Sequence, residues 1–145
     1  MVALLDVNAL IALFWSSHNF HPRMQGWFAA NSGSGWATCA FTEAGFVRVV
    51  SNPMFSPRAV SPVEAIELLE GAVQHAGHRF WEDEVSVADA TRSIRAHLIG
   101  HQQVTDAYLL GLAIHKEGKL VTFDRSIAAL VPGHGGGASY LEIIR

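Results

Sequence analysis

Short apolar segments with strand character alternate with helical patterns along this chain of 145 residues. Most of these segments are followed by a stretch in which apolar residues recur at the spacing of an amphipathic helix. Alternation of this kind predicts an α/β fold, with a parallel sheet of about four to five strands and helices on both of its faces. The predicted strands are VALL (2–5), WATC (36–39), HRFWE (78–82), KLVTF (119–123) and SYLEII (139–144).

The helical segments carry recognisable boundary signals. Ser61, Pro62 and Glu64 occupy the cap, first and third positions of one predicted helix, and Ser86 stands at the cap of another. The predicted helices cover residues 7–15, 22–33, 42–52, 61–77, 86–98, 105–118 and 124–130. The glycine-rich segment GHGGG (133–137) precedes the last strand and is predicted to be a loop.

Composition indicates one folded domain spanning residues 1–145. Half of the residues are apolar and 16% are charged, which excludes a disordered chain. The formal net charge of −3 provides no overall basic surface for DNA binding, although it leaves room for a nucleic-acid enzyme with an acidic site.

The apolar runs are too short for a membrane helix, so no membrane association is expected. Cys39 is the only cysteine and can form no internal disulfide, which favours the cytoplasm.

Four acidic residues occupy comparable places in this scheme. Asp6 and Asp124 follow predicted strands, Glu43 lies in the first turn of the helix after WATC, and Asp106 opens the helix TDAYLLGLA. In a parallel sheet the carboxyl ends of the strands meet at one edge, where ligands bind. All four carboxylates are therefore expected at that edge.

Each acid also has a purely structural interpretation. Asp6 and Asp124 could cap the helices that follow them, and Glu43 and Asp106 could be first-turn acids favoured by the helix dipole. Taken together, four like charges at one edge repel each other unless a cation is present. Oxygen ligands without His or Cys indicate Mg²⁺, with Mn²⁺ as a substitute. The sequence thus predicts Asp6, Glu43, Asp106 and Asp124 as both metal ligands and catalytic residues.

Four segments, in order and spacing, resemble a known family: LLDVNALIAL, TEAGFVRVV, TDAYLLGLA and LVTFDRSIA. They resemble a PIN-domain nuclease and, more narrowly, a VapC-type ribonuclease toxin of a toxin–antitoxin system. The resemblance implies a magnesium-dependent endoribonuclease that acts on RNA, binds a cognate antitoxin protein and forms a homodimer. It also implies that Asn8 and Thr122 support the acidic site.

Two other functions remain open from the sequence. LLDVN is loosely similar to the first motif of an aspartate-nucleophile phosphohydrolase, but Asn8 stands where that chemistry needs a second carboxylate. Its site lysine is also lacking, because Lys116 and Lys119 flank the opposite end of KLVTF. The other alternative is a catalytically silent binding module on the same fold.

Overall fold

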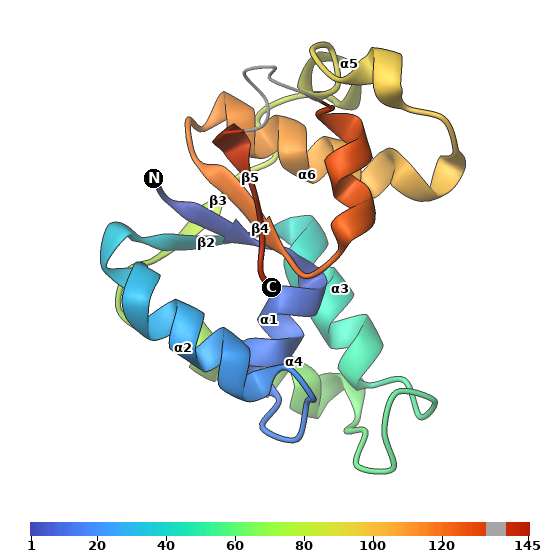
Figure 1. Ribbon diagram of the computed structural model, residues 1–145. Helices are drawn as coiled ribbons and strands as arrows, with labels where there is room; N and C mark the ends of the chain where they lie inside the picture. Colours follow the sequence, from blue (N-terminus) through green and yellow to red (C-terminus); the bar gives the residue numbers. More distant parts are fainter. Residues whose placement is uncertain (133–138) are drawn as a thin grey trace.

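The centre of the molecule is a five-stranded parallel sheet (Figure 1). A computed structural model describes residues 1–132 and 139–145. The strand order is β3-β2-β1-β4-β5, and every neighbouring pair is parallel. The strands are β1 (Ala3–Leu5), β2 (Trp36–Cys39), β3 (His78–Trp81), β4 (Lys119–Thr122) and β5 (Leu141–Ile143). The predicted α/β architecture is confirmed. The predicted loop at 133–137 lies outside the described residues.

Helices cover both faces of the sheet, with α1 to α4 on one side and α5 and α6 on the other (Figure 1). Successive strand residues point to opposite faces. Leu5 and Trp36 belong to the core beneath α1–α4, whereas Leu4 and Ala37 belong to the core beneath α6. The α-helices are α1 (Val7–Phe14), α2 (His21–Asn31), α3 (Ala40–Val50), α4 (Pro62–Ala72), α5 (Val87–Ala90) and α6 (Val104–His115).

Four short 3₁₀ helices complete the described structure. The segment predicted as a short helix after β4 is one of them, because its turns close tightly from Asp124 onward. They are η1 (Ser32–Ser34), η2 (Arg95–His97), η3 (His101–Gln103) and η4 (Arg125–Leu130). None of the helices in the described ranges is long and apolar enough to cross a membrane.

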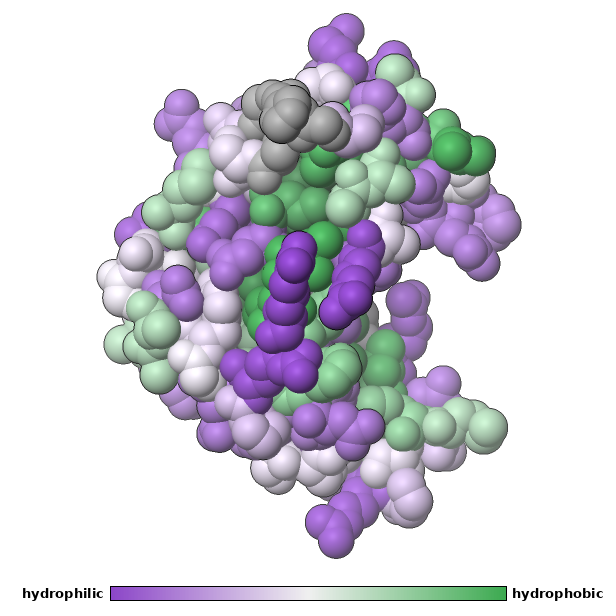
Figure 2. Space-filling view, viewed as in Figure 1, coloured by the Kyte–Doolittle hydropathy of each residue, from purple (hydrophilic) through white to green (hydrophobic). Residues whose placement is uncertain are grey.

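The surface is hydrophilic around a central apolar area. Figure 2 shows hydrophobic residues gathered over β4 and β5, with hydrophilic residues across and around them. The same view shows the molecule indented between the part that contains α5 and α6 and the part that contains α3 and α4. This indentation lies on the side toward which the strands end (Figure 1).

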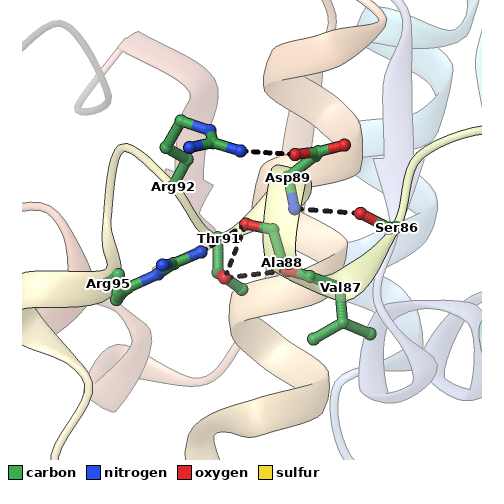
Figure 3. Close-up of polar contacts among 7 residues, drawn as sticks. All are labelled: Ser86, Val87, Ala88, Asp89, Thr91, Arg92 and Arg95. Carbon is green, nitrogen blue, oxygen red and sulfur yellow. Dashed lines mark hydrogen bonds and ion pairs between the residues drawn. The ribbon is translucent and has the colours of Figure 1, made fainter.

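The helix predicted over residues 86–98 is correct only at its start (Figure 3). Ser86 caps it as predicted, with its hydroxyl oxygen accepting a hydrogen bond from the Asp89 N–H at 3.1 Å. The α-helix nevertheless ends at Ala90, after a single turn. The prediction of a continuous helix through residue 98 is therefore wrong.

Side-chain hydrogen bonds explain the early end of α5. In a continued helix, the Ala88 carbonyl would accept from the Arg92 N–H. Instead, the Arg92 N–H bonds the Asp89 carbonyl at 3.3 Å. The Arg95 guanidinium donates to the Ala88 carbonyl at 2.6 Å (Figure 3). The Thr91 hydroxyl also bonds back to the Val87 carbonyl at 2.7 Å. Such bonds compete with the helical ladder and stop it locally.

Helix α5 lies against α6 at a position where only glycine fits. A Cβ built on Gly111 would lie 2.0 Å from the carbonyl oxygen of Ala90, which is backbone and cannot rotate away. Gly26, in the middle of α2, has no atom within 4 Å of the same position. Substitution of Gly111 by alanine therefore tests the α5–α6 contact, and the same substitution at Gly26 is the matched control.

We expect Gly111→Ala to lower the free energy of unfolding by about 1–3 kcal/mol, the usual range for overpacking a close contact. Gly26→Ala should instead raise the free energy of unfolding by up to about 1 kcal/mol, because alanine has a higher helix propensity than glycine at an exposed helix position. Urea denaturation of both variants and of the wild type measures the difference. Equal stabilities for the two variants would contradict the close approach of α5 and α6.

Candidate active site

Two predicted site residues follow neighbouring strands at the centre of the sheet. Asp6 comes directly after β1 and Asp124 comes two residues after β4, and these two strands are paired. From β1 the chain passes through α1 on one face, whereas β4 is entered from α6 on the other. The order of the sheet thus reverses between β1 and β4, the point at which open parallel sheets bind ligands. Asp106 adds a third carboxylate from the first turn of α6.

Asp6 is buried in a polar network that joins the two strands. Only 6% of its surface is exposed. Its carboxylate accepts hydrogen bonds from the Val7 N–H at 2.8 Å and the Thr122 hydroxyl at 2.7 Å. The Asn8 amide donates to the Thr122 hydroxyl at 3.0 Å, and its own oxygen accepts from the Phe123 N–H at 3.0 Å. The residues predicted to support the site, Asn8 and Thr122, therefore hold Asp6 in place.

Asp6 and Asp124 also cap helices, as the structural interpretation suggested. Asp6 caps α1 through the Val7 N–H, and Asp124 accepts from the Ser126 N–H at 2.9 Å at the start of η4. Each cap uses one oxygen, Oδ1, and the Oδ2 of Asp6 accepts from Thr122. Capping thus fixes the orientation of both carboxylates without excluding a second role.

The three aspartates lie close enough to influence one another electrostatically. Burial and the charge of Asp124 raise the pKa of Asp6, against the lowering effect of its hydrogen bonds. Burial, followed by the charges of Asp6 and Asp124, raises the pKa of Asp106 to about 6. Within residues 1–132 and 139–145, no Lys, Arg or His forms an ion pair with any of the three. Their mutual repulsion is therefore not offset by a protein cation.

Glu43, the fourth predicted ligand, has different neighbours. Its carboxylate accepts a hydrogen bond from the Thr38 hydroxyl on β2 at 2.6 Å, and it acts electrostatically on His78 of β3. The Thr38 hydroxyl also lies 2.8 Å from the His78 ring nitrogen. No hydrogen bond in the described residues connects Glu43 to an aspartate of the site. Its participation in a metal site stays a prediction.

The three aspartates suit a hard cation. They offer only oxygen ligands, and Mg²⁺ is usually held by one or two carboxylates while retaining several waters. In the described ranges, no group of three or more His, Cys, Asp or Glu side chains is arranged to hold a metal ion. Binding of Mg²⁺ or Mn²⁺ by the aspartates therefore stays a prediction.

Asp83 is a further acidic residue at the carboxyl-terminal edge of the sheet. None of the four segments that resemble the family includes it. It follows β3 by two residues, at the same offset as Asp124 from β4. Its charge acts on Tyr108 of α6, whose pKa is raised by burial and by Asp83. The offset from the strand end is the signal by which Asp83 could have been found.

Comparison with known families agrees with this geometry. Residues 3–131 match the PIN domain. The chain belongs to the PIN-domain family. Its relatives place it among the VapC-type members: Ribonuclease VapC38 of Mycobacterium tuberculosis is 48% identical over 129 residues, covering 89% of each chain. Ribonuclease VapC44 of the same species is 47% identical over 134 residues, covering 92% of this chain and 94% of the relative.

The fold of this PIN domain also matches a solved structure. A crystal structure of VapBC2 from Rickettsia felis, bound to a DNA fragment from their promoter, aligns with a TM-score of 0.67. The alignment covers 100% of both chains at 14% sequence identity, which supports the fold alone.

The raised pKa of Asp106 predicts a pH dependence of stability in the metal-free PIN domain. Because the folded state holds the proton up to about pH 6, whereas an unfolded Asp has a pKa of 3.8, the folded state binds more protons between these values. Stability should therefore fall as the pH rises from about 4 to 6. Asp106→Asn, which removes this titration, should show a smaller decline; part of the decline should remain, because the pKa of Asp6 is also raised.

Thermal melting in EDTA between pH 4 and 7 measures the effect. Glu67→Gln, which removes an exposed carboxyl on α4, serves as the control and should follow the wild type. Parallel pH profiles for the wild type and Asp106→Asn would show that Asp106 is not crowded by the other aspartates.

Proposed function

We propose that this PIN domain is a magnesium-dependent endoribonuclease that hydrolyses RNA phosphodiester bonds as the toxin of a toxin–antitoxin pair. The observation that carries the proposal is a group of three aspartates, Asp6, Asp106 and Asp124, at the point where the strand order reverses; none of them forms an ion pair within the described residues. Relatives named ribonucleases, 47–48% identical over most of the chain, support the choice of RNA.

The chemistry divides between the metal and the protein. When bound, Mg²⁺ would activate water and stabilise the charge that develops on the phosphate and the leaving oxygen. The protein orients the carboxylates that would bind the ion, since Thr122 and Asn8 fix Asp6 and the Ser126 N–H fixes Asp124. Because a ligand carboxylate must be deprotonated, metal affinity should decrease as the pH falls below the pKa of Asp106, about 6.

The phosphohydrolase alternative fits the described side chains less well. Asn8 uses its amide to hold Thr122 and Phe123, so it supports the site rather than supplying a second carboxylate. Both lysines are engaged elsewhere: Lys116 pairs with Glu84, and Lys119, at the start of β4, pairs with Glu142. Neither lysine is placed to neutralise a phosphate at the aspartates.

A catalytically silent binding module would keep the repulsion among the three carboxylates although its function does not require it. Burial and the charge of Asp124 raise the pKa of Asp6, and burial and the charges of Asp6 and Asp124 raise the pKa of Asp106. This arrangement destabilises the metal-free fold, and such a cost is retained at functional sites. This argument favours an enzyme over a module that only binds.

Neutralisation by an antitoxin is part of the same proposal. A carboxylate group without a basic partner can accept an arginine from a bound protein as a bidentate ion pair. We propose a cognate antitoxin as this partner, a homodimer as the assembly, and the cytoplasm as the location. The solved relative of the same fold is a VapBC2 structure, which is consistent with a partner protein.

We expect the purified protein, freed of its partner, to cleave single-stranded RNA with Mg²⁺ or Mn²⁺ and to stop in EDTA. Asp6→Asn and Asp124→Asn should reduce cleavage to background while the proteins remain folded. Adding the protein encoded beside this chain should inhibit the wild type. Gel analysis of RNA products, with sequencing of the RNA ends, measures all three effects.

Glu67→Gln is the matched control, because it also removes one carboxylate but lies on exposed α4. Its cleavage should equal that of the wild type. Cleavage that persists in EDTA, or a fully active Asp6→Asn protein, would contradict the proposed metal-dependent nuclease.

A further inference from the structure

A cavity of about 460 Å³ lies beside the aspartates. Val7 and Thr105, which line it, are the chain neighbours of Asp6 and Asp106. Its other walls come from α3, from Phe41 in the first turn to Arg48 in the last, and from Asp83 in the segment after β3. Its size falls within the range of about 300–1,000 Å³ typical of small-ligand sites.

We propose that this cavity receives one nucleotide of a single-stranded RNA substrate, adjacent to the phosphate that is cut. The inference rests on the proposed nuclease function and adds to it a subsite for the nucleoside. The cavity combines a stacking surface, a cation and a hydrogen-bond acceptor, which are the groups that proteins use to bind splayed RNA bases.

Phe41 provides the stacking surface. Its side chain is 48% exposed and lies in the first turn of α3. The far side of the ring is supported by Tyr108, with centroids 5.1 Å apart at 52°. Tyr108 is itself buried, and its hydroxyl donates to the Val85 carbonyl at 3.2 Å. The aromatic ring is therefore held in position before any base binds, which lowers the entropy lost on binding.

Arg48 and Asp83 have no side-chain hydrogen bond or ion pair in the described part of the chain. Both are exposed and line the same cavity. A guanidinium binds phosphate oxygens, whereas a carboxylate repels them and accepts from base amino groups. The two charges thus define a direction for a nucleotide, with its phosphate toward Arg48 and the edge of its base toward Asp83. Purely apolar partners would leave both charges unpaired.

A neighbouring groove shares Ala40, Ala44 and Arg48 with this cavity but continues toward α4 and β3. There it is lined by Val47, Ile66, Leu69 and Phe80, and it does not include Val7, Phe41, Asp83 or Thr105. Phe80 is 51% exposed, close to the value for Phe41. Phe80 therefore offers a matched control: an exposed phenylalanine on the same molecule but outside the proposed subsite.

The test measures binding of fluorescently labelled single-stranded RNA by anisotropy in EDTA, where no cleavage occurs. Phe41→Leu should raise the Kd about tenfold, in line with the loss of one base–aromatic stack. Phe41→Trp should keep the Kd near the wild-type value, because the aromatic surface is retained. Phe80→Leu should bind RNA as the wild type does.

Base selectivity provides a second readout, taken from RNA ends sequenced after cleavage with Mg²⁺. Asp83→Asn should change the nucleotide preference at one position beside the cut, because an amide donates as well as accepts. Arg48→Ala should raise KM more than it lowers kcat, and Arg58→Ala, in the exposed segment after α3, should change neither.

The outcomes separate this inference from the proposed function. Absence of any metal-dependent cleavage would overturn the nuclease proposal and, with it, the subsite. Normal cleavage with unchanged RNA affinity and base preference in Phe41→Leu and Asp83→Asn would overturn the subsite alone. Loss of antitoxin binding in the same variants, with RNA binding intact, would show that the cavity binds protein and would also overturn it.

Discussion

The hydrogen bond from the Thr122 hydroxyl to the Asp6 carboxylate, 2.7 Å long, connects the two central strands at their carboxyl ends. A buried carboxylate without such donors would disfavour folding by several kcal/mol. Asp6 therefore requires Thr122 and the Val7 N–H, and their positions require β1 and β4 to be neighbours. The arrangement fixes the site and the strand order together. It also leaves the carboxylate close to two others, which is unfavourable unless a cation binds.

Much of the fold could be predicted from local patterns. The five strands and the presence of helices on both faces follow from short apolar runs and amphipathic spacing. The cap at Ser61 appears as expected, with the Glu64 N–H bonded to its hydroxyl at 3.2 Å. Helix lengths were harder to predict. Helix α5 ends at Ala90 because Arg95 reaches back to the Ala88 carbonyl, a contact that depends on side-chain direction rather than on spacing.

The same limit applies to the site. Three of the predicted acids could be placed because strand ends and the first turn of α6 fix where their backbones lie. Glu43 sits on α3 at the expected position, but its carboxylate is bound by Thr38 on β2. Tertiary packing alone determines which group the Glu43 carboxylate contacts. Phe41 and Asp83 line one cavity from separate parts of the chain, and Tyr108 of α6 contacts the Phe41 ring, so no single segment of sequence contains the cavity.

The proposed metal site implies that a bound cation relieves the burial and the repulsion that raise the pKa of Asp6. The most direct measurement is the melting temperature of the wild type and of Asp6→Asn, each in EDTA and with Mg²⁺. Asparagine caps a helix about as well as aspartate, so a cap alone predicts little change. The account predicts that Asp6→Asn melts higher than the wild type in EDTA, and that Mg²⁺ stabilises the wild type more than the variant. Equal melting temperatures in EDTA together with equal responses to Mg²⁺ would contradict it and leave Asp6 as a helix cap.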